Sequence, residues 1–273
     1  MVDTECRAIF PIHSKRVWQV KTHPSCKSFA SCSADGTIQI TNIDASESFS
    51  LEEVSKKSVR SISYSHDGRL FAACGFDGTT KIWNTSSAPS SASASSTPSV
   101  SSYFLICTLE GHENEVKCVD WAPVSLISSA TYLLATCGRD KSIWLWAIEV
   151  DSFSSSSQEV LAILQEHTQD VKCIAFHPEY PGIMASASAD ESIRVWVDCD
   201  SDVIGRGDGD WVSKALLTGH TGIVWQVAWL TSNLLLSASE DGTARMWGPS
   251  SLAYRLAHAI HFAQNSIFRA GDW

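Results

Sequence analysis

The fold is decided by the stretch Gly111-His112-Glu113-Asn114-Glu115-Val116-Lys117-Cys118-Val119-Asp120-Trp121, which is followed after a loop by Leu133-Leu134-Ala135-Thr136-Cys137-Gly138-Arg139-Asp140-Lys141-Ser142-Ile143-Trp144-Leu145-Trp146. Its apolar runs are as long as strands, are rich in Val, Ile, Leu and Trp, and are separated by turn residues. None of the runs is long enough to predict a helix. The stretch therefore predicts short β-strands joined by tight turns.

The same unit recurs along the chain. Two full copies run from Glu166 to Trp196 and from Gly219 to Trp247, and two degenerate copies surround Asp35-Gly36 and Asp77-Gly78. Units of about 40–45 residues that open with Gly-His and close near Trp-Asp are typical of β-propeller blades. The chain thus resembles the WD-repeat family, and this resemblance predicts an all-β propeller.

Four side chains keep a fixed spacing in the three full copies. A His opens the unit, and a turn Asp follows a Ser or Thr by four residues and precedes a Trp by six. The sets are His112, Thr136, Asp140 and Trp146; His167, Ser186, Asp190 and Trp196; and His220, Ser237, Asp241 and Trp247. In the WD-repeat family such residues form a buried hydrogen-bonded tetrad, which avoids the cost of burying unpaired polar groups. A Ser-His-Asp hydrolase triad is the alternative, but a nucleophile gives no reason for three copies in register.

We expect a single domain over residues 1–273. The predicted blades cover residues 12–43, 54–84, 109–147, 161–197 and 211–248, with a sixth begun at residues 252–273. The ring of the resembled family has seven blades, so the resemblance indicates either a truncated chain or an open ring. A leading strand at residues 7–11 would close the ring, because closure removes exposed strand edges.

The first two units match the tetrad pattern incompletely. In the first unit His13 and Asp35 match, but Thr41 takes the Trp position. In the second unit Lys57 lies near the His position and Ala73 takes the Ser position. We therefore expect these two blades to depend mainly on packing.

Three segments between the units have the composition of loops. Residues 86–102 are almost entirely Ser, Ala, Pro and Thr, and such a segment buries too little surface to offset its ordering entropy. This composition predicts a flexible insertion between blades. Residues 152–157 and the acidic residues 198–210 are predicted to be similar loops.

Composition excludes several classes of protein. The formal net charge of −10 argues against a surface that binds nucleic acid through phosphates. No apolar run reaches the roughly 18 residues of a membrane span, and the first residues do not form a signal peptide. The nine cysteines contain no Cys-x-x-Cys pair, so we predict no metal or other cofactor. The expectation is an intracellular protein that binds neither nucleic acid nor membranes.

Two stretches resemble a narrower family. Residues 110–117 with residues 135–142, and residues 164–172, are similar to the third and fourth blades of the WD-repeat subunits of the cytosolic iron-sulfur protein assembly (CIA) targeting complex. The resemblance implies a cytoplasmic, and also nuclear, scaffold that is not an enzyme. The partners that it implies are a small protein of the same pathway, a helical-repeat adaptor and apo-proteins that await iron-sulfur clusters.

The geometry of a propeller blade points to candidate partner-binding residues. Side chains on either side of the first inner-strand Val, and the residue before the turn Asp, should face the narrow rim around the channel. The candidates are Arg16, Trp18, Arg60, Phe76, Glu115, Lys117, Arg139, Asp170, Lys172 and Trp225. Arg and Trp are enriched in binding hot spots.

Arg139 is the first candidate, because the resemblance points to the same matched position. The alternative is that Arg139 pairs locally with Glu115 or Asp140, which contributes little when exposed. Trp18 and Trp225 are open to a second interpretation as core residues.

Three other functions stay open at this point. A generic WD-repeat adaptor, such as a substrate receptor of a ubiquitin ligase, would need an accessory domain, and the sequence shows none. An enzyme would use His112, His167 or His220 with a nearby Asp, and burial of these pairs would exclude that chemistry. A cluster carrier is disfavoured by the scattered cysteines.

Overall fold

The chain forms antiparallel β-sheets throughout the part that can be described. The computed structural model describes residue 6 and residues 8–43, 47–51, 54–85, 103–123, 131–152, 155–199 and 210–248. Within these ranges every regular element is a strand. Consecutive strands pair, so each of the five sheets is a simple meander. This arrangement confirms the predicted all-β propeller with five blades.

The strands are grouped by sheet as follows. The first sheet contains β1 (Val17–Thr22), β2 (Ser28–Ser33), β3 (Ile38–Asn42) and β4 (Ser48–Ser50). The second contains β5 (Val59–Tyr64), β6 (Leu70–Gly75), β7 (Thr80–Asn84) and β8 (Phe104–Leu109). The third contains β9 (Val116–Trp121), β10 (Thr131–Gly138), β11 (Ile143–Ser152) and β12 (Ser155–Leu164). The fourth contains β13 (Val171–Phe176), β14 (Ile183–Ser188), β15 (Ile193–Asp198) and β16 (Trp211–Leu217). The fifth contains β17 (Val224–Thr231), β18 (Leu234–Ser239) and β19 (Ala244–Trp247).

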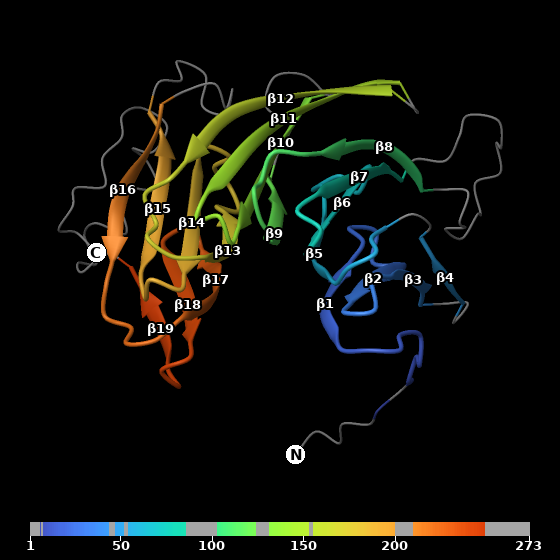
Figure 1. Ribbon diagram of the computed structural model, residues 1–273, viewed down its shortest axis with the longest axis horizontal. Helices are drawn as coiled ribbons and strands as arrows, with labels where there is room; N and C mark the ends of the chain where they lie inside the picture. Colours follow the sequence, from blue (N-terminus) through green and yellow to red (C-terminus); the bar gives the residue numbers. More distant parts are fainter. Residues whose placement is uncertain are drawn as a thin grey trace.

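The five sheets, which we call blades one to five, follow an arc. Figure 1 shows blade one and blade five at its two ends, with β1, β5, β9, β13 and β17 on the inner side. Apolar clusters fill the spaces between neighbouring blades. The middle strands β6 and β14 are buried on both faces, and β14 is built from Ile, Met, Ala and Ser because two blades approach it closely.

Each blade is displaced by one strand from the sequence unit. The outer strands β8, β12 and β16 belong to blades two, three and four, although each precedes the His that opens the next unit. The predicted units 161–197 and 211–248 therefore begin on the preceding blade. Packing between adjacent blades is thus reinforced by the covalent continuity of the chain.

Two predicted segments differ from the structure. Residues 8–11 of the predicted leading strand do not form a strand, since no strand edge in the described part of the chain pairs with them and Phe10 instead packs edge-on against Phe29. Residues 152–157 were expected to be a loop, but β11 and β12 extend through most of them as a long hairpin. Pairing between the two strands satisfies backbone groups of this polar segment, and the Ser156 hydroxyl donates to the Ile106 carbonyl of blade two at 3.5 Å.

Other predictions fall outside the described residues. The Ser-rich insertion at residues 86–102 and the start of a sixth blade at residues 252–273 lie there, as do residues 200–209 of the acidic segment.

Candidate functional site

A continuous chain of hydrogen bonds crosses blade three. Trp146 Nε1 donates to Thr136 Oγ1 at 2.9 Å, and Thr136 Oγ1 lies 2.9 Å from His112 Nε2. His112 Nδ1 lies 2.7 Å from Asp140 Oδ2. Because the carboxylate can only accept, Nδ1 carries the proton and Nε2 accepts from the threonine hydroxyl. Each polar atom in this buried chain therefore has a partner, and we call the four residues a clasp.

Blades four and five contain the same clasp. The three successive distances from Asp to His, from His to Ser and from Trp to Ser are 2.8, 2.7 and 2.8 Å in blade four. They are 2.7, 2.7 and 2.9 Å in blade five. The structure thus brings together the four residues of every predicted tetrad.

Burial excludes the three clasps from hydrolytic chemistry. Ser186 is fully buried, and its hydroxyl is shared between His167 and Trp196. The three His side chains have at most 3% of their surface exposed. A nucleophile and its base must reach a substrate, so these Ser-His-Asp arrangements serve the fold.

The clasp aspartates are held in their ionised form. Burial alone would raise the pKa of Asp190, but hydrogen bonds from His167 and Ser192 outweigh burial and hold the pKa well below its usual value. The pKa of Asp140 is lowered by the same balance, with His112 and Ser142 as donors. The clasps therefore stabilise the blades most when these carboxylates are charged.

Blade one has a partial clasp. His13 Nε2 lies 2.8 Å from Ser31 Oγ, and His13 Nδ1 lies 3.3 Å from Asp35. Thr41, at the Trp position, instead bonds to Ser48 at 2.8 Å. The predicted His13–Asp35 pair is therefore present without an indole.

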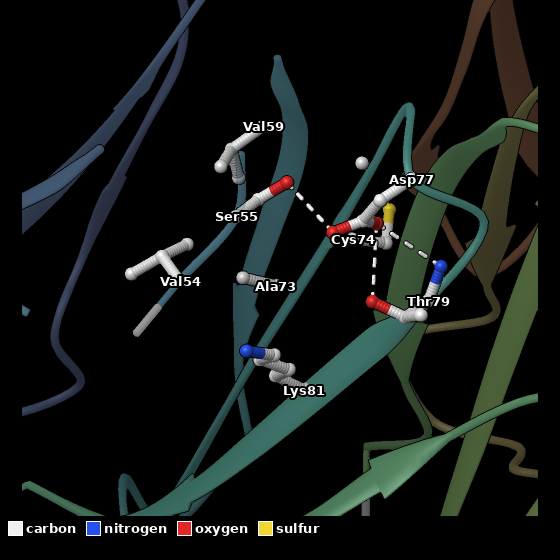
Figure 2. Close-up of a pocket in the computed structure, with 9 residues that line it drawn as sticks. Val54, Ser55, Val59, Ala73, Cys74, Asp77, Thr79 and Lys81 are labelled. Atoms are coloured by element: carbon white, nitrogen blue, oxygen red, sulfur yellow. Dashed lines mark hydrogen bonds between the residues drawn. The ribbon is translucent and has the colours of Figure 1, made fainter. Parts of the chain in front are cut away.

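Blade two has no imidazole at the His position of the clasp. Ser55, four residues before the first inner-strand Val, takes the His position and donates to Asp77 Oδ2 at 2.6 Å. Lys57, which was expected near this position, donates its backbone N–H to Ser55 Oγ at 3.0 Å, and Ser55 is the residue that contacts Asp77. Figure 2 shows Ser55 and Thr79 converging on Asp77, with Ala73 beside them. A small pocket that opens to solvent lies among these residues.

The candidate rim residues are positioned by a repeated backbone hydrogen bond. The residue before each turn Asp donates to the residue before the first inner-strand Val at 2.8–2.9 Å. The pairs are Ala34 with Arg16, Phe76 with Ser58, Arg139 with Glu115, Ala189 with Asp170, and Glu240 with Ile223. These ten residues therefore lie in pairs along one end of the blades, which we call the rim.

A β-bulge adds one further side chain to the rim of each blade. The register of every inner strand shifts directly after its first Val, and a bulge re-aims the extra residue. The bulged residues are Trp18, Arg60, Lys117, Lys172 and Trp225. All five are cationic or aromatic.

Cation–π contacts join these residues across blades. Arg16 and Arg60 lie 5.0 and 4.9 Å from the centre of the Trp18 ring. Lys117 lies 4.3 Å from the ring centre of Phe76, and Lys172 lies 5.3 Å from that of Trp225. The candidate residues thus form three groups along the rim.

Arg139 lies in the middle group and remains accessible. Its guanidinium is 3.8 Å from Glu115, while Glu115 also pairs closely with Lys117. The Arg139 side chain is 56% exposed. The local pair that we considered as an alternative is therefore present but loose.

The two tryptophans of the rim differ. Trp18 is half-buried, packs against the core between blades one and two, and donates to Ser58 Oγ at 2.8 Å. Trp225 is 44% exposed. Trp18 thus contributes both to the core and to the rim, whereas Trp225 is a surface residue.

No pattern in the sequence indicates the half-buried carboxylate of Asp120 on the inner side of the arc. Asp120 accepts from the backbone N–H of Phe176 at 3.0 Å and from Ser63 Oγ at 3.2 Å, so it links blades two, three and four. Burial raises its pKa to about 6, against the lowering effect of Lys21. Asp120 lies outside the repeat pattern, so only the spatial contact of three blades identifies it.

The described residues contain no group of three or more His, Cys, Asp or Glu side chains that could hold a metal ion. Among those same residues, no helix is long and apolar enough to cross a membrane.

Repeated antiparallel blades, three of them fastened from within by a complete clasp, define this chain as a β-propeller repeat protein. The pattern of the family described as "WD domain, G-beta repeat" matches residues 4–42, 49–84, 104–147, 158–197 and 211–248. The chain belongs to this family and, within it, to the group of cytosolic iron-sulfur protein assembly proteins with which it aligns over most of its length.

Three fungal relatives are named "Probable cytosolic iron-sulfur protein assembly protein 1". The Neurospora crassa relative is 37% identical over 52% of this chain and 35% of its own length. The Scheffersomyces stipitis relative is 31% identical over 89% of this chain and 71% of its own length. The Vanderwaltozyma polyspora relative is 34% identical over 85% of this chain and 80% of its own length. The chain thus spans about a third of the first of these relatives and most of the other two.

Proposed function

We propose that this protein is a non-enzymatic scaffold of the cytosolic iron-sulfur protein assembly machinery. It helps to deliver clusters to apo-proteins of the cytosol and the nucleus, and the cluster is cargo that the scaffold itself does not hold. The observation that carries the proposal is the alignment of nearly the whole chain with relatives that are named for this process.

The rim supports the proposal as the docking platform. It presents cationic and aromatic side chains from all five blades, and these residue types dominate binding energy at interfaces. The clasps fix the position of the rim. The docking platform is therefore preorganised, and binding costs little ordering entropy. The partners in this proposal are a small protein of the same pathway, a helical-repeat adaptor and the apo-proteins.

The experiment is depletion of the protein in the cells that produce it. We expect cytosolic and nuclear iron-sulfur enzymes to lose activity while mitochondrial iron-sulfur enzymes keep theirs. Re-expression of the wild-type chain should restore the lost activities. Unchanged cytosolic enzymes after depletion would contradict the proposed function.

A further inference from the structure

We propose that the rim of blades one and two is a binding site for an acidic polypeptide segment. The site consists of Lys15, Arg16, Trp18, Lys56, Lys57 and Arg60, which we call the basic patch. This inference rests on the proposed scaffold function, because it specifies the chemistry of one docking partner.

The two loops that carry the basic patch lie side by side. A Cβ added to Gly36 of blade one would stand 2.7 Å from the backbone oxygen of Ser55 and 3.0 Å from that of Lys57. Trp18 of blade one donates to Ser58 of blade two. Arg16 and Arg60 therefore lie close to one indole ring, and Lys15, Lys56 and Lys57 belong to the two adjoining loops.

The cations of the basic patch lack the carboxylate partners that the other rim cations have. Lys172 pairs with Asp170 at 2.9 Å, and Lys117 pairs with Glu115. In the described ranges, by contrast, none of the five cations of the basic patch forms an ion pair. The clasp carboxylates Asp35 and Asp77 are engaged by donors of their own blades.

The guanidinium groups of Arg16 and Arg60 favour a carboxylate ligand. Arg16 and Arg60 both lie close to the Trp18 ring, and their planar donor pairs match a carboxylate in bidentate geometry. The indole adds an apolar surface for the aliphatic stems of Glu side chains. A segment that alternates acidic and small residues would therefore meet both features.

The charge of the whole chain favours a short peptide over a nucleic acid. The net charge is −10, so a long polyanion is repelled beyond the basic patch. A short segment confined to the two loops meets only the local positive potential.

The test is fluorescence anisotropy with a labelled ten-residue peptide of alternating Glu and Gly, titrated with the full chain at low salt. The double variant Arg16→Gln/Arg60→Gln should weaken binding about tenfold or more, since charge-assisted hydrogen bonds are lost. Lys15→Gln/Lys57→Gln alters only exposed side chains and should weaken binding in the same direction. The matched control is Lys27→Gln, which removes an exposed cation beyond the opposite end of β1 and should leave binding unchanged.

Three results would overturn this inference. They are equal binding of a Gln-Gly peptide, wild-type affinity in both double variants, or tighter binding of a single-stranded oligonucleotide that carries the same number of charges. Thermal midpoints of all variants establish that they are folded. Failure of the Glu-Gly peptide to bind would leave the depletion experiment unaffected, so the two proposals can fail separately.

Discussion

At the scale of single residues, the turn after each clasp Asp requires left-handed backbone. Gly36, Gly78 and Gly242 supply it in blades one, two and five, with φ between 81° and 89°. Lys141 and Glu191 adopt φ of 70° and 68° in blades three and four. Left-handed backbone costs a side-chain-bearing residue roughly 1 kcal/mol, so these two turns are strained.

Glu191→Gly should therefore stabilise the protein by about 0.5–1 kcal/mol through relief of this strain, offset in part by the greater entropy of the unfolded chain. The matched variant is Gly242→Ala, where an added Cβ would meet no atom within 4 Å. It should destabilise by about 1 kcal/mol for backbone reasons alone. The free energy of unfolding of both variants is measured with urea. A lower value for Glu191→Gly than for the wild type would contradict the claim that the turn at Glu191 is strained.

Asp120 should control stability between about pH 4 and pH 6. Its usual pKa of 3.8 is raised to about 6 by burial, so the folded chain holds this proton more tightly than the unfolded chain. Its contribution to stability therefore increases as pH falls from 6 towards 4. The clasp aspartates have lowered pKa values, so their contribution is lost only below about pH 4.

Asp120→Asn should remove the pH dependence in this window, because the amide oxygen still accepts from Phe176 and does not titrate. The measurement is the urea midpoint of wild type and variant at several pH values from 4 to 7. The exposed carboxyl of Glu159 provides the control variant Glu159→Gln. If the urea midpoint of Asp120→Asn changes with pH as steeply as that of the wild type, another group is responsible for the pH dependence.

At the scale of the element, the clasp decides how firmly each blade is fastened. Ser186→Ala in blade four leaves both Trp196 Nε1 and His167 Nε2 without a buried partner. We expect a loss of about 2–4 kcal/mol. In blade two, Ser55→His with Ala73→Ser should restore the His and Ser positions of the clasp around Asp77 and gain about 1 kcal/mol. Thermal and urea unfolding test both, and a repaired blade two that is less stable than wild type would argue against the clasp.

How much of these elements could be predicted depends on the pattern each residue follows. The clasps of blades three to five were predictable, because the spacing of His112, Thr136, Asp140 and Trp146 repeats in register. Ser55 was not, because its hydroxyl takes the place of an imidazole and so departs from the repeat pattern. The end of the β11–β12 hairpin was not predictable, because its Ser-rich residues are typical of a loop, whereas cross-strand pairing determines their structure.

At the scale of the whole molecule, the repeat turns local features into one surface. A bulge that re-aims one side chain in each inner strand places five cationic or aromatic residues along the rim. Sequence spacing could predict that these residues share one end of the blades. Their pairing could not be predicted, because the cation–π contacts join residues of different blades.

The central claim is that the rim binds the partners of the scaffold, and Arg139→Glu tests it most directly. Arg139 is exposed and its only described ion pair is the loose contact with Glu115, so the variant should keep the thermal midpoint of the wild type. Tagged wild type, Arg139→Glu and the control Lys27→Glu are used to capture proteins of the iron-sulfur assembly machinery from cells. We predict that Arg139→Glu captures at least about tenfold less of these partners, as is typical for loss of a hot-spot residue, while Lys27→Glu captures as much as wild type. Capture by Arg139→Glu at the wild-type level would contradict the account.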